Sequence, residues 1–315
     1  MIDFRYHLVS LIAVFLAVAL GIVIGTTALN EPILADIKNQ VSDLEQDKRS
    51  LEDRTQGLQA QLDTSVAFDE AVAPALVEGA LAGSTVLLVV TNEDVAPETV
   101  DQVMSLIGDA GGTVSGTVTL KPEYSDPSTA TSLQNYGTGP GRPAGIQLPA
   151  VDDAGQLVGS LLAQVLMIPP SGTAPEGAAV SSVLAGLSAL DVLTAEGDSV
   201  APADYAVVLT SGAFSGPDAA ERNATVAELV TALDSAGSGA VVSGDPDAAA
   251  ENGLIGMIRA DPGLSAAIST VDNAATAAGR ISTVLALGRE GEGTSGKYGT
   301  GEDTQPVPPV PAATP

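Results

Sequence analysis

The sequence predicts an α/β protein in three parts. An apolar N-terminal helix continues into a coiled coil, and a domain with a Rossmann-like or flavodoxin-like, mostly parallel sheet follows. Three observations predict this organisation. Residues 8–29 contain no charged side chain, and an apolar heptad repeat follows them up to residue 65. Beyond residue 71, short β-branched runs alternate with helical stretches, which is typical of an α/β layer fold.

Residues 8–29 are the predicted transmembrane anchor. About 22 helical residues span roughly 33 Å, enough to cross a hydrocarbon core of about 30 Å. Residues 1–7 carry Arg5 and the terminal amine, which favours a cytoplasmic N-terminus and an extracytoplasmic main body. A cleaved signal peptide is the alternative, because residues 26–28 (Thr-Thr-Ala) resemble a cleavage site. The apolar run exceeds the usual signal length of about 7–15 residues, so we predict an uncleaved single-pass anchor in the cell membrane.

Small residues recur at every fourth position of the anchor, at Ala13, Ala17, Gly21 and Gly25. Small side chains let two helix backbones approach closely in lipid, where packing drives helix association. Ala and Gly are also common in membrane helices generally, which is the simpler explanation. Because a heptad repeat follows directly, we predict a parallel homodimer with helix packing at these positions.

Residues 30–70 form the predicted coiled coil. Its core positions alternate at spacings of four and three, which is the heptad signature. The predicted core comprises Leu34, Ile37, Val41, Leu44, Lys48, Leu51, Thr55, Leu58 and Leu62. The two polar core residues weaken the seam, and polar residues there commonly set register and oligomeric state. We predict self-pairing, with a coiled-coil envelope protein as the alternative partner and docking on the chain's own domain as a third interpretation.

The composition excludes several classes of function. Acidic residues outnumber basic residues 39 to 12, for a net charge of −27. Such a surface repels phosphate backbones, so we predict no nucleic-acid binding. The chain has no cysteine, which excludes disulfides, thiolate metal sites and cysteine nucleophiles. The single histidine, His7, lies in the N-terminal flank and cannot build a catalytic triad in the globular part. We predict no enzyme and no resident cofactor.

Residues 71–289 form the predicted extracytoplasmic α/β domain. Strands are predicted at residues 85–91, 113–120, 205–210, 240–243 and 267–271. Helices are predicted at residues 97–110, 152–167, 177–193, 218–235, 247–259 and 274–287. Residues 121–149 are rich in Pro, Gly, Ser and Thr and predict a long loop or a disordered insertion.

The C-terminal segment, residues 290–315, is predicted to be a disordered tail because Gly, Glu, Thr and Pro cannot build a core. Residues 291–297 match most of a phosphate-binding loop. However, Tyr298 stands where that motif needs Ser or Thr, and the segment follows a helix instead of a strand. We therefore predict no nucleotide site there.

Ligands of doubly wound sheets bind beyond the carboxyl ends of the strands. The residues that follow the predicted strands include Ser211, Asp245, Asp272 and Asn273. Asp245 and Asp272 can form an acidic pair for a hard cation or for acid–base chemistry. Asp, Asn and Ser at such positions are more often helix caps and turn residues. These four residues are therefore a possible crevice ligand site, with turn formation as the stronger interpretation.

Two N-terminal stretches carry a family resemblance. Residues 1–11 (MIDFRYHLVSL) and 20–26 (LGIVIGT) resemble the start of the mycobacterial copper transport protein B (MctB) family, and residues 271–287 are similar near the other end. The resemblance covers most of the chain and implies an actinobacterial envelope protein. Family members are described as copper-efflux channels of the outer membrane, and SteB-like members are linked to cell separation through a partner and peptidoglycan hydrolases.

Two functions follow from these patterns. The residues predict a membrane-anchored coiled-coil scaffold or regulator of the cell envelope, with control of cell separation and peptidoglycan hydrolases as one form of that role. The resemblance implies the alternative, a pore-forming copper-efflux or copper-homeostasis component that resides in the outer membrane. Copper as a ligand is implied by the resemblance only.

Overall fold

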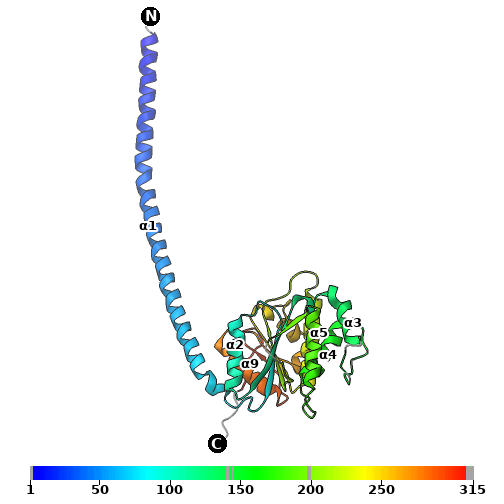
Figure 1. Cartoon of the computed structure of the whole chain (residues 1–315). Helices are drawn as coiled ribbons and strands as arrows, with labels where there is room; N and C mark the ends of the chain where they lie inside the picture. Colours follow the sequence, from blue (N-terminus) through cyan, green and yellow to red (C-terminus); the bar gives the residue numbers. More distant parts are fainter. Residues whose placement is uncertain (1–2, 140–141, 144, 197–199, 310–315) are drawn as a thin grey trace. The chain divides into compact units, whose positions relative to one another are not determined.

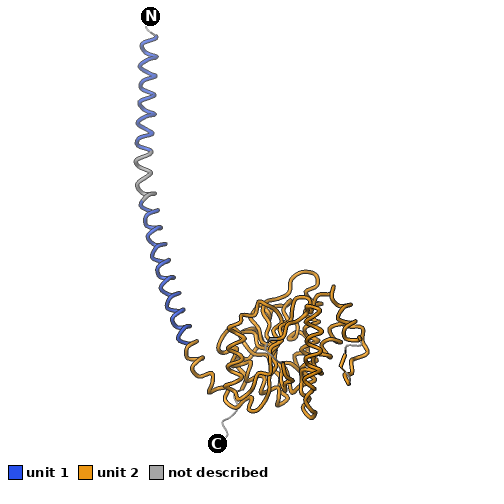
Figure 2. The backbone as a smooth tube through the Cα atoms, viewed as in Figure 1, with its two compact units in different colours: residues 1–65 blue, residues 66–315 orange. Residues whose placement is uncertain are grey.

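A computed structural model describes residues 3–139, 142–143, 145–196 and 200–309; the side chains of residues 3, 26–34 and 196 lie outside this description. The chain divides into two compact units, residues 1–65 and residues 66–315 (Figure 2). The first unit consists of one helix. The second contains the end of that helix and the α/β domain.

Helix α1 extends over Asp3–Val77 as one continuous element (Figure 1). Its segment Phe4–Gly25 has a mean hydropathy of 2.9 and is the one helix, among the described residues, that is long and apolar enough to cross a membrane. The backbone stays helical through the predicted coiled coil. The last turns, within the second unit, bury Ala73 and Val77 in the core of the α/β domain.

Seven strands of the described chain form one sheet in the order β3-β2-β1-β4-β5-β6-β7. The strands are β1 Thr85–Val90, β2 Thr113–Leu120, β3 Leu193–Glu196, β4 Tyr205–Thr210, β5 Ala240–Gly244, β6 Ser269–Val271 and β7 Lys297–Tyr298. All neighbours pair in parallel except β2 and β3, which are antiparallel. The mostly parallel sheet is confirmed. The order of the first six strands is that of a Rossmann fold with β3 reversed.

Helices cover both faces of the sheet (Figure 1). One face carries α2 (Pro97–Asp109), α9 (Ala277–Glu290) and the end of α1. The other carries α4 (Ala154–Leu166), α5 (Gly177–Ala189) and α6 (Ala219–Ala236). The remaining helices are α3 (Ala130–Thr138), α7 (Leu254–Ala260) and α8 (Pro262–Ala267).

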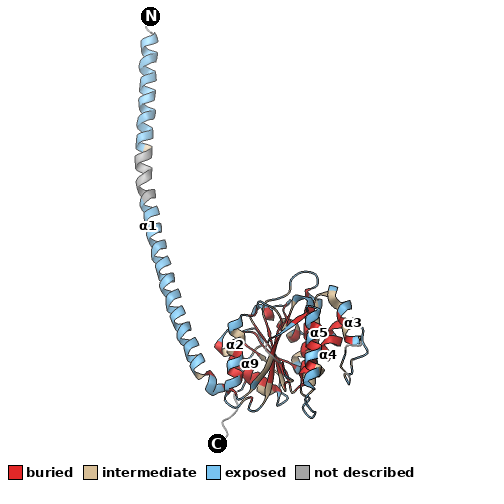
Figure 3. Cartoon of the chain, viewed as in Figure 1, coloured by how far each residue is buried: buried red, intermediate tan, exposed pale blue. Residues whose placement is uncertain are grey.

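The central strands are largely apolar, as expected for strands that are buried on both faces (Figure 3). In β1, Val86 and Leu88 pack into the cluster with α2 and α9, whereas Leu87 and Val89 pack into the cluster with α4 and α6. This alternation follows from the two-residue period of a strand. The domain therefore has one hydrophobic layer on each side of the sheet.

Three predictions about the α/β domain were wrong. Part of the predicted loop at residues 121–149 forms short 3₁₀ helices at Pro122–Tyr124 and Pro127–Thr129, followed by α3. Helix α5 ends at Ala189, before the predicted end at residue 193, and strand β3 follows where no strand was predicted. The described part of the predicted disordered tail, up to residue 309, folds against the sheet and supplies β7, which pairs with β6. Each of these segments is held by contacts with distant residues that local composition does not reveal.

Candidate functional site

The carboxyl ends of β1 and β4 form the topological switch point of the sheet. The chain leaves β1 toward β2 and leaves β4 toward β5, so the two connections diverge from neighbouring strands. A cavity of about 240 Å³ opens at this point. Its wall includes residues at the ends of three strands and residues of α6; among them are Thr91, Asn92, Lys121, Thr210, Ser211 and Arg222. Doubly wound sheets bind their ligands at this place.

Asp245 connects the ends of β4 and β5. Its carboxylate accepts hydrogen bonds from the Ser211 hydroxyl (2.6 Å), the Gly212 amide (3.0 Å) and the Ala248 amide (2.8 Å). Gly212 has a φ of +68°, a conformation that a side chain disfavours. The hydrogen bonds of Asp245 thus serve the turns that follow the two strands.

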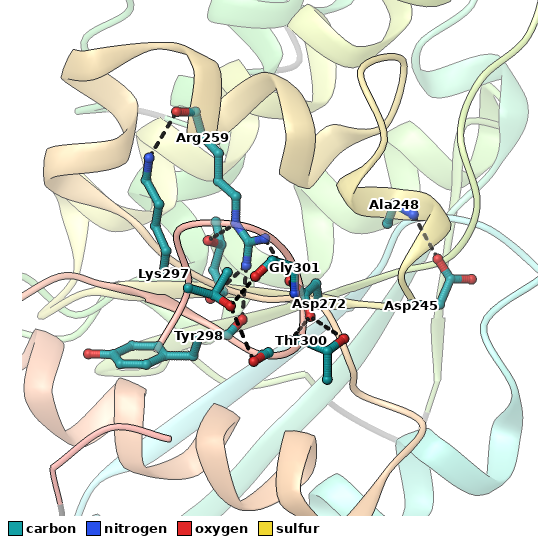
Figure 4. A network of polar contacts seen from close by, with 11 residues as sticks. Asp245, Ala248, Arg259, Asp272, Lys297, Tyr298, Thr300 and Gly301 are labelled. Atoms are coloured by element: carbon teal, nitrogen blue, oxygen red, sulfur yellow. Dashed lines mark hydrogen bonds and ion pairs between the residues drawn. The ribbon is translucent and has the colours of Figure 1, made fainter. Parts of the chain in front are cut away.

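Asp272 fastens the C-terminal segment to the sheet (Figure 4). This buried carboxylate contacts the Arg259 guanidinium at 2.7 Å and accepts from the amides of Thr300 (2.7 Å) and Gly301 (3.1 Å). Arg259 also donates to the Tyr298 carbonyl at 2.9 Å. Burial opposes ionisation, but the Arg259 contact and the two amides outweigh it and hold the pKa of Asp272 below its usual value.

The four predicted crevice residues do not line one cavity. Ser211 lines the switch-point cavity, whereas Asp245, Asp272 and Asn273 do not. Within the described residues, each of the two carboxylates has its own donors and no contact joins them (Figure 4). The backbone carbonyl of Asn273 accepts from the Thr276 amide at 2.9 Å, while its side-chain oxygen is buried and has no hydrogen-bond partner among the described residues. The predicted acidic pair is therefore not assembled.

The two basic residues of the cavity were missed by sequence reasoning. Lys121 follows β2 and forms an ion pair with Asp191, whose hydrogen bond raises the pKa of the lysine. Arg222 donates from Nε to the Ser125 hydroxyl (3.2 Å) and from Nη2 to the Pro122 carbonyl (2.9 Å). One signal was available, because Arg222 is the only basic residue between Arg142 and Arg259.

The heptad residues of α1 form a second candidate surface, which we call the heptad stripe. Its described apolar members are Ile37, Val41, Leu44, Leu51, Leu58 and Leu62, and their exposed fractions range from 50% to 69%. The side chain of the predicted member Leu34 lies outside the description. Lys48 pairs with Glu52 of the same helix at 3.4 Å, and Thr55 donates to the Leu51 carbonyl at 2.8 Å. Both polar members of the stripe thus have partners within their own helix.

The described residues contain no group of three or more His, Cys, Asp or Glu side chains arranged to hold a metal ion.

Comparison with known proteins identifies the family. The family model described as "Copper transport outer membrane protein, MctB" matches residues 1–309. The "Copper transporter MctB" proteins of Mycobacterium bovis and Mycobacterium tuberculosis are 34% identical over 312 residues, covering 98% of this chain and 99% of theirs. The Mycobacterium leprae protein of the same name is 32% identical over 309 residues, covering 96% of this chain and 97% of its own. This chain therefore belongs to the MctB family.

Proposed function

We propose that this protein is a single-pass, membrane-anchored scaffold or regulator of the cell envelope. Two copies pair in parallel along α1, with their N-termini in the cytoplasm and their α/β domains outside the membrane. Control of cell separation through peptidoglycan hydrolases is one form of this role. The observation that carries the proposal is the heptad stripe, a row of exposed apolar side chains on a helix that continues from the apolar segment.

The heptad stripe has the shape of a coiled-coil seam. Apolar residues occupy about two positions in seven, which is narrower than the face by which a helix packs on a globular core. Burial of each such side chain contributes about 1.5–3 kcal/mol relative to its exposure. A second copy presents the same residues at the same height above the membrane, so self-pairing covers the stripe in register. A different coiled-coil envelope protein is the alternative occupant.

Of the predicted packing positions within the anchor, Ala13 lies on this seam, whereas Ala17, Gly21 and Gly25 do not. The heptad register extends into the anchor through Val9, Ala13, Leu16 and Leu20. In that register Gly21 and Gly25 occupy outward-facing positions, because a four-residue spacing drifts from a seven-residue repeat. Because α1 is continuous from Asp3 to Val77, we expect the heptad seam to extend through the membrane.

Cysteine cross-linking tests this proposal, and the absence of native cysteine makes it specific. In full-length protein in cell membranes, we expect Leu44→Cys and Leu16→Cys to form intermolecular disulfides rapidly, because core positions of paired helices face each other. The matched controls Ala60→Cys and Gly21→Cys, at outward positions, should cross-link slowly. Rapid cross-linking at Gly21 with none at Leu16 would assign the anchor contact to the small residues. No cross-linking at Leu44 would reject self-pairing.

The second candidate function is copper efflux or copper homeostasis, with the outer membrane as its associated location. The names of the mycobacterial relatives support it. This proposal predicts saturable binding of Cu⁺ with a whole-number stoichiometry, measured by calorimetry on full-length protein in lipid nanodiscs. It also predicts Cu⁺ flux into liposomes that contain the protein and not into empty ones. If both binding and flux are absent, the copper proposal fails while the pairing proposal stands.

A further inference from the structure

We propose that the switch-point cavity binds a small organic monocarboxylate through Arg222. This inference is independent of how α1 pairs and of copper. The cavity lies between the ends of β1 and β4, where the diverging connections leave a crevice open to a ligand. The side chain of Arg222, several polar residues and several apolar residues line this cavity.

Arg222 is held in place but has no carboxylate partner within the described residues. By contrast, Lys121, Arg259, Arg280 and Arg289 each contact an acidic side chain. The Arg222 guanidinium is fixed by the neutral Ser125 hydroxyl and Pro122 carbonyl and stacks on Phe214, 4.5 Å from the ring centre. Its Nη1 makes no hydrogen bond to the described chain. A fixed planar guanidinium with free N–H groups is suited to bind a carboxylate.

The rest of the wall supplies polar and apolar groups. The hydroxyls of Thr91 and Thr210 lie 2.9 Å apart, with Thr91 donating to Thr210. Val226 of α6 and Leu254 of α7 also line the cavity, and both are buried in the hydrophobic core. A carboxylate that carries a short apolar group matches this mixed lining.

The charges around the cavity favour a monoanion over a dianion. Asp94 lines the cavity, and Asp191 neutralises Lys121. Hydrogen bonds from Ser128, with a contribution from Arg222, hold the pKa of nearby Asp126 below its usual value, so this carboxylate is charged at neutral pH. A phosphate dianion would meet these carboxylates with only Arg222 to balance it.

The size of the cavity fits a small ligand. Its volume of about 240 Å³ lies below the range of roughly 300–1,000 Å³ typical of sites for drug-sized molecules. The turn after β1, residues 91–94, contains no glycine to cradle a phosphate. We infer a ligand of a few carbon atoms, such as a short-chain acid or a small amino acid.

Methyl NMR of full-length protein in lipid nanodiscs tests this site. We expect titration with propionate or L-alanine to produce saturable shifts of the Val226 and Leu254 methyl signals, with inorganic phosphate producing none. Arg222→Gln should weaken the affinity at least about tenfold, since it removes a charged hydrogen-bonding partner. Arg142→Gln is the matched control, because it makes the same charge change at an exposed arginine outside the cavity, and it should bind like the wild type.

A second pair of variants tests the proposal without replacing Arg222, in case Arg222→Gln does not fold. Ala213→Glu places a carboxylate at the cavity wall without removing a native side-chain contact, and it should abolish binding by repulsion and by competition for Arg222. Ala213→Gln has nearly the same shape without the charge and should retain binding. Absence of saturable shifts with both probes at tens of millimolar would overturn the proposal. So would equal affinity in Arg222→Gln, or tighter binding of phosphate than of either carboxylate.

Discussion

The variant Arg259→Met is expected to lose about 3 kcal/mol of unfolding free energy at neutral pH. The reason is the charge left behind, because Asp272 is 1% exposed and Arg259 is its only ion-pair partner in the described chain. The guanidinium also contacts the Tyr298 carbonyl, so β7 should open together with the ion pair. Chemical denaturation measures the free energy, and hydrogen exchange at Thr300 and Gly301 measures the opening of the segment.

The pH dependence separates an unpaired charge from simple loss of packing. In the wild type the pKa of Asp272 is lowered, so its contribution to stability is present above the pKa of the unfolded chain. That contribution is lost as the pH falls through the folded-state pKa. In Arg259→Met the unpaired carboxylate should instead have a raised pKa, and the deficit should shrink as the pH falls and the group protonates.

The double variant Arg259→Met/Asp272→Asn is the control for this ion pair. It removes the unpaired charge while keeping a side-chain oxygen that can accept one backbone amide, so it should be more stable than Arg259→Met at neutral pH. A single variant as stable as the wild type would show that the ion pair does not hold the C-terminal segment. A double variant no better than the single one would show that packing, not charge, is responsible.

The variant Leu58→Asp is expected to weaken pairing of α1 by at least about 100-fold in the dissociation constant. Each copy loses one buried leucine, which costs about 2–5 kcal/mol in well-packed cores, and gains a carboxylate that must leave water. Sedimentation equilibrium of full-length protein in density-matched detergent measures the constant. Cross-linking at Leu44→Cys in the same background should fall in parallel.

Ala60→Asp is the matched control for Leu58→Asp. It introduces the same acidic residue two positions away on the same exposed helix, but at an outward heptad position. Its net charge equals that of the test variant, and replacing alanine by aspartate lowers helix propensity slightly more than replacing leucine does. A larger effect of Leu58→Asp therefore reports the place on the seam. Equal weakening by the two variants would assign the effect to charge or helix stability and would reject the heptad seam.

The match to the MctB family covers both units of the chain. The family match and the mycobacterial relatives span nearly the whole chain, from the apolar segment through the α/β domain. Both units therefore belong to the part of the chain that the family shares. The pairing, copper and carboxylate experiments address α1, metal handling and the switch-point cavity separately, so each can fail without deciding the others.

Sequence patterns located the parts of the chain whose structure depends on the order of neighbouring residues. The strands β1, β2 and β4 were predicted nearly to the residue. Strands β1 and β4 are buried on both faces and are nearly continuous apolar runs, which makes them evident in the sequence. The apolar segment Phe4–Gly25 was likewise evident, because composition alone decides whether a helix can span a lipid bilayer. The crevice residues were placed at the correct edge because parallel strands end together.

Contacts between distant residues decided the rest. Composition predicted disorder after residue 290, yet Asp272 binds the amides of Thr300 and Gly301 and makes β7 part of the sheet. The same contacts give Asp272, which the sequence offered as a possible ligand and more strongly as a turn residue, a structural role. Arg222 looked like an ordinary surface charge until folding set it beside Ser125 and Phe214. By itself the sequence determined the apolar helix, the heptad repeat and the fold class, because these depend on periodicity. Only the tertiary structure decided which polar groups are already bonded and which remain available to a ligand, because those partners lie far apart in the chain.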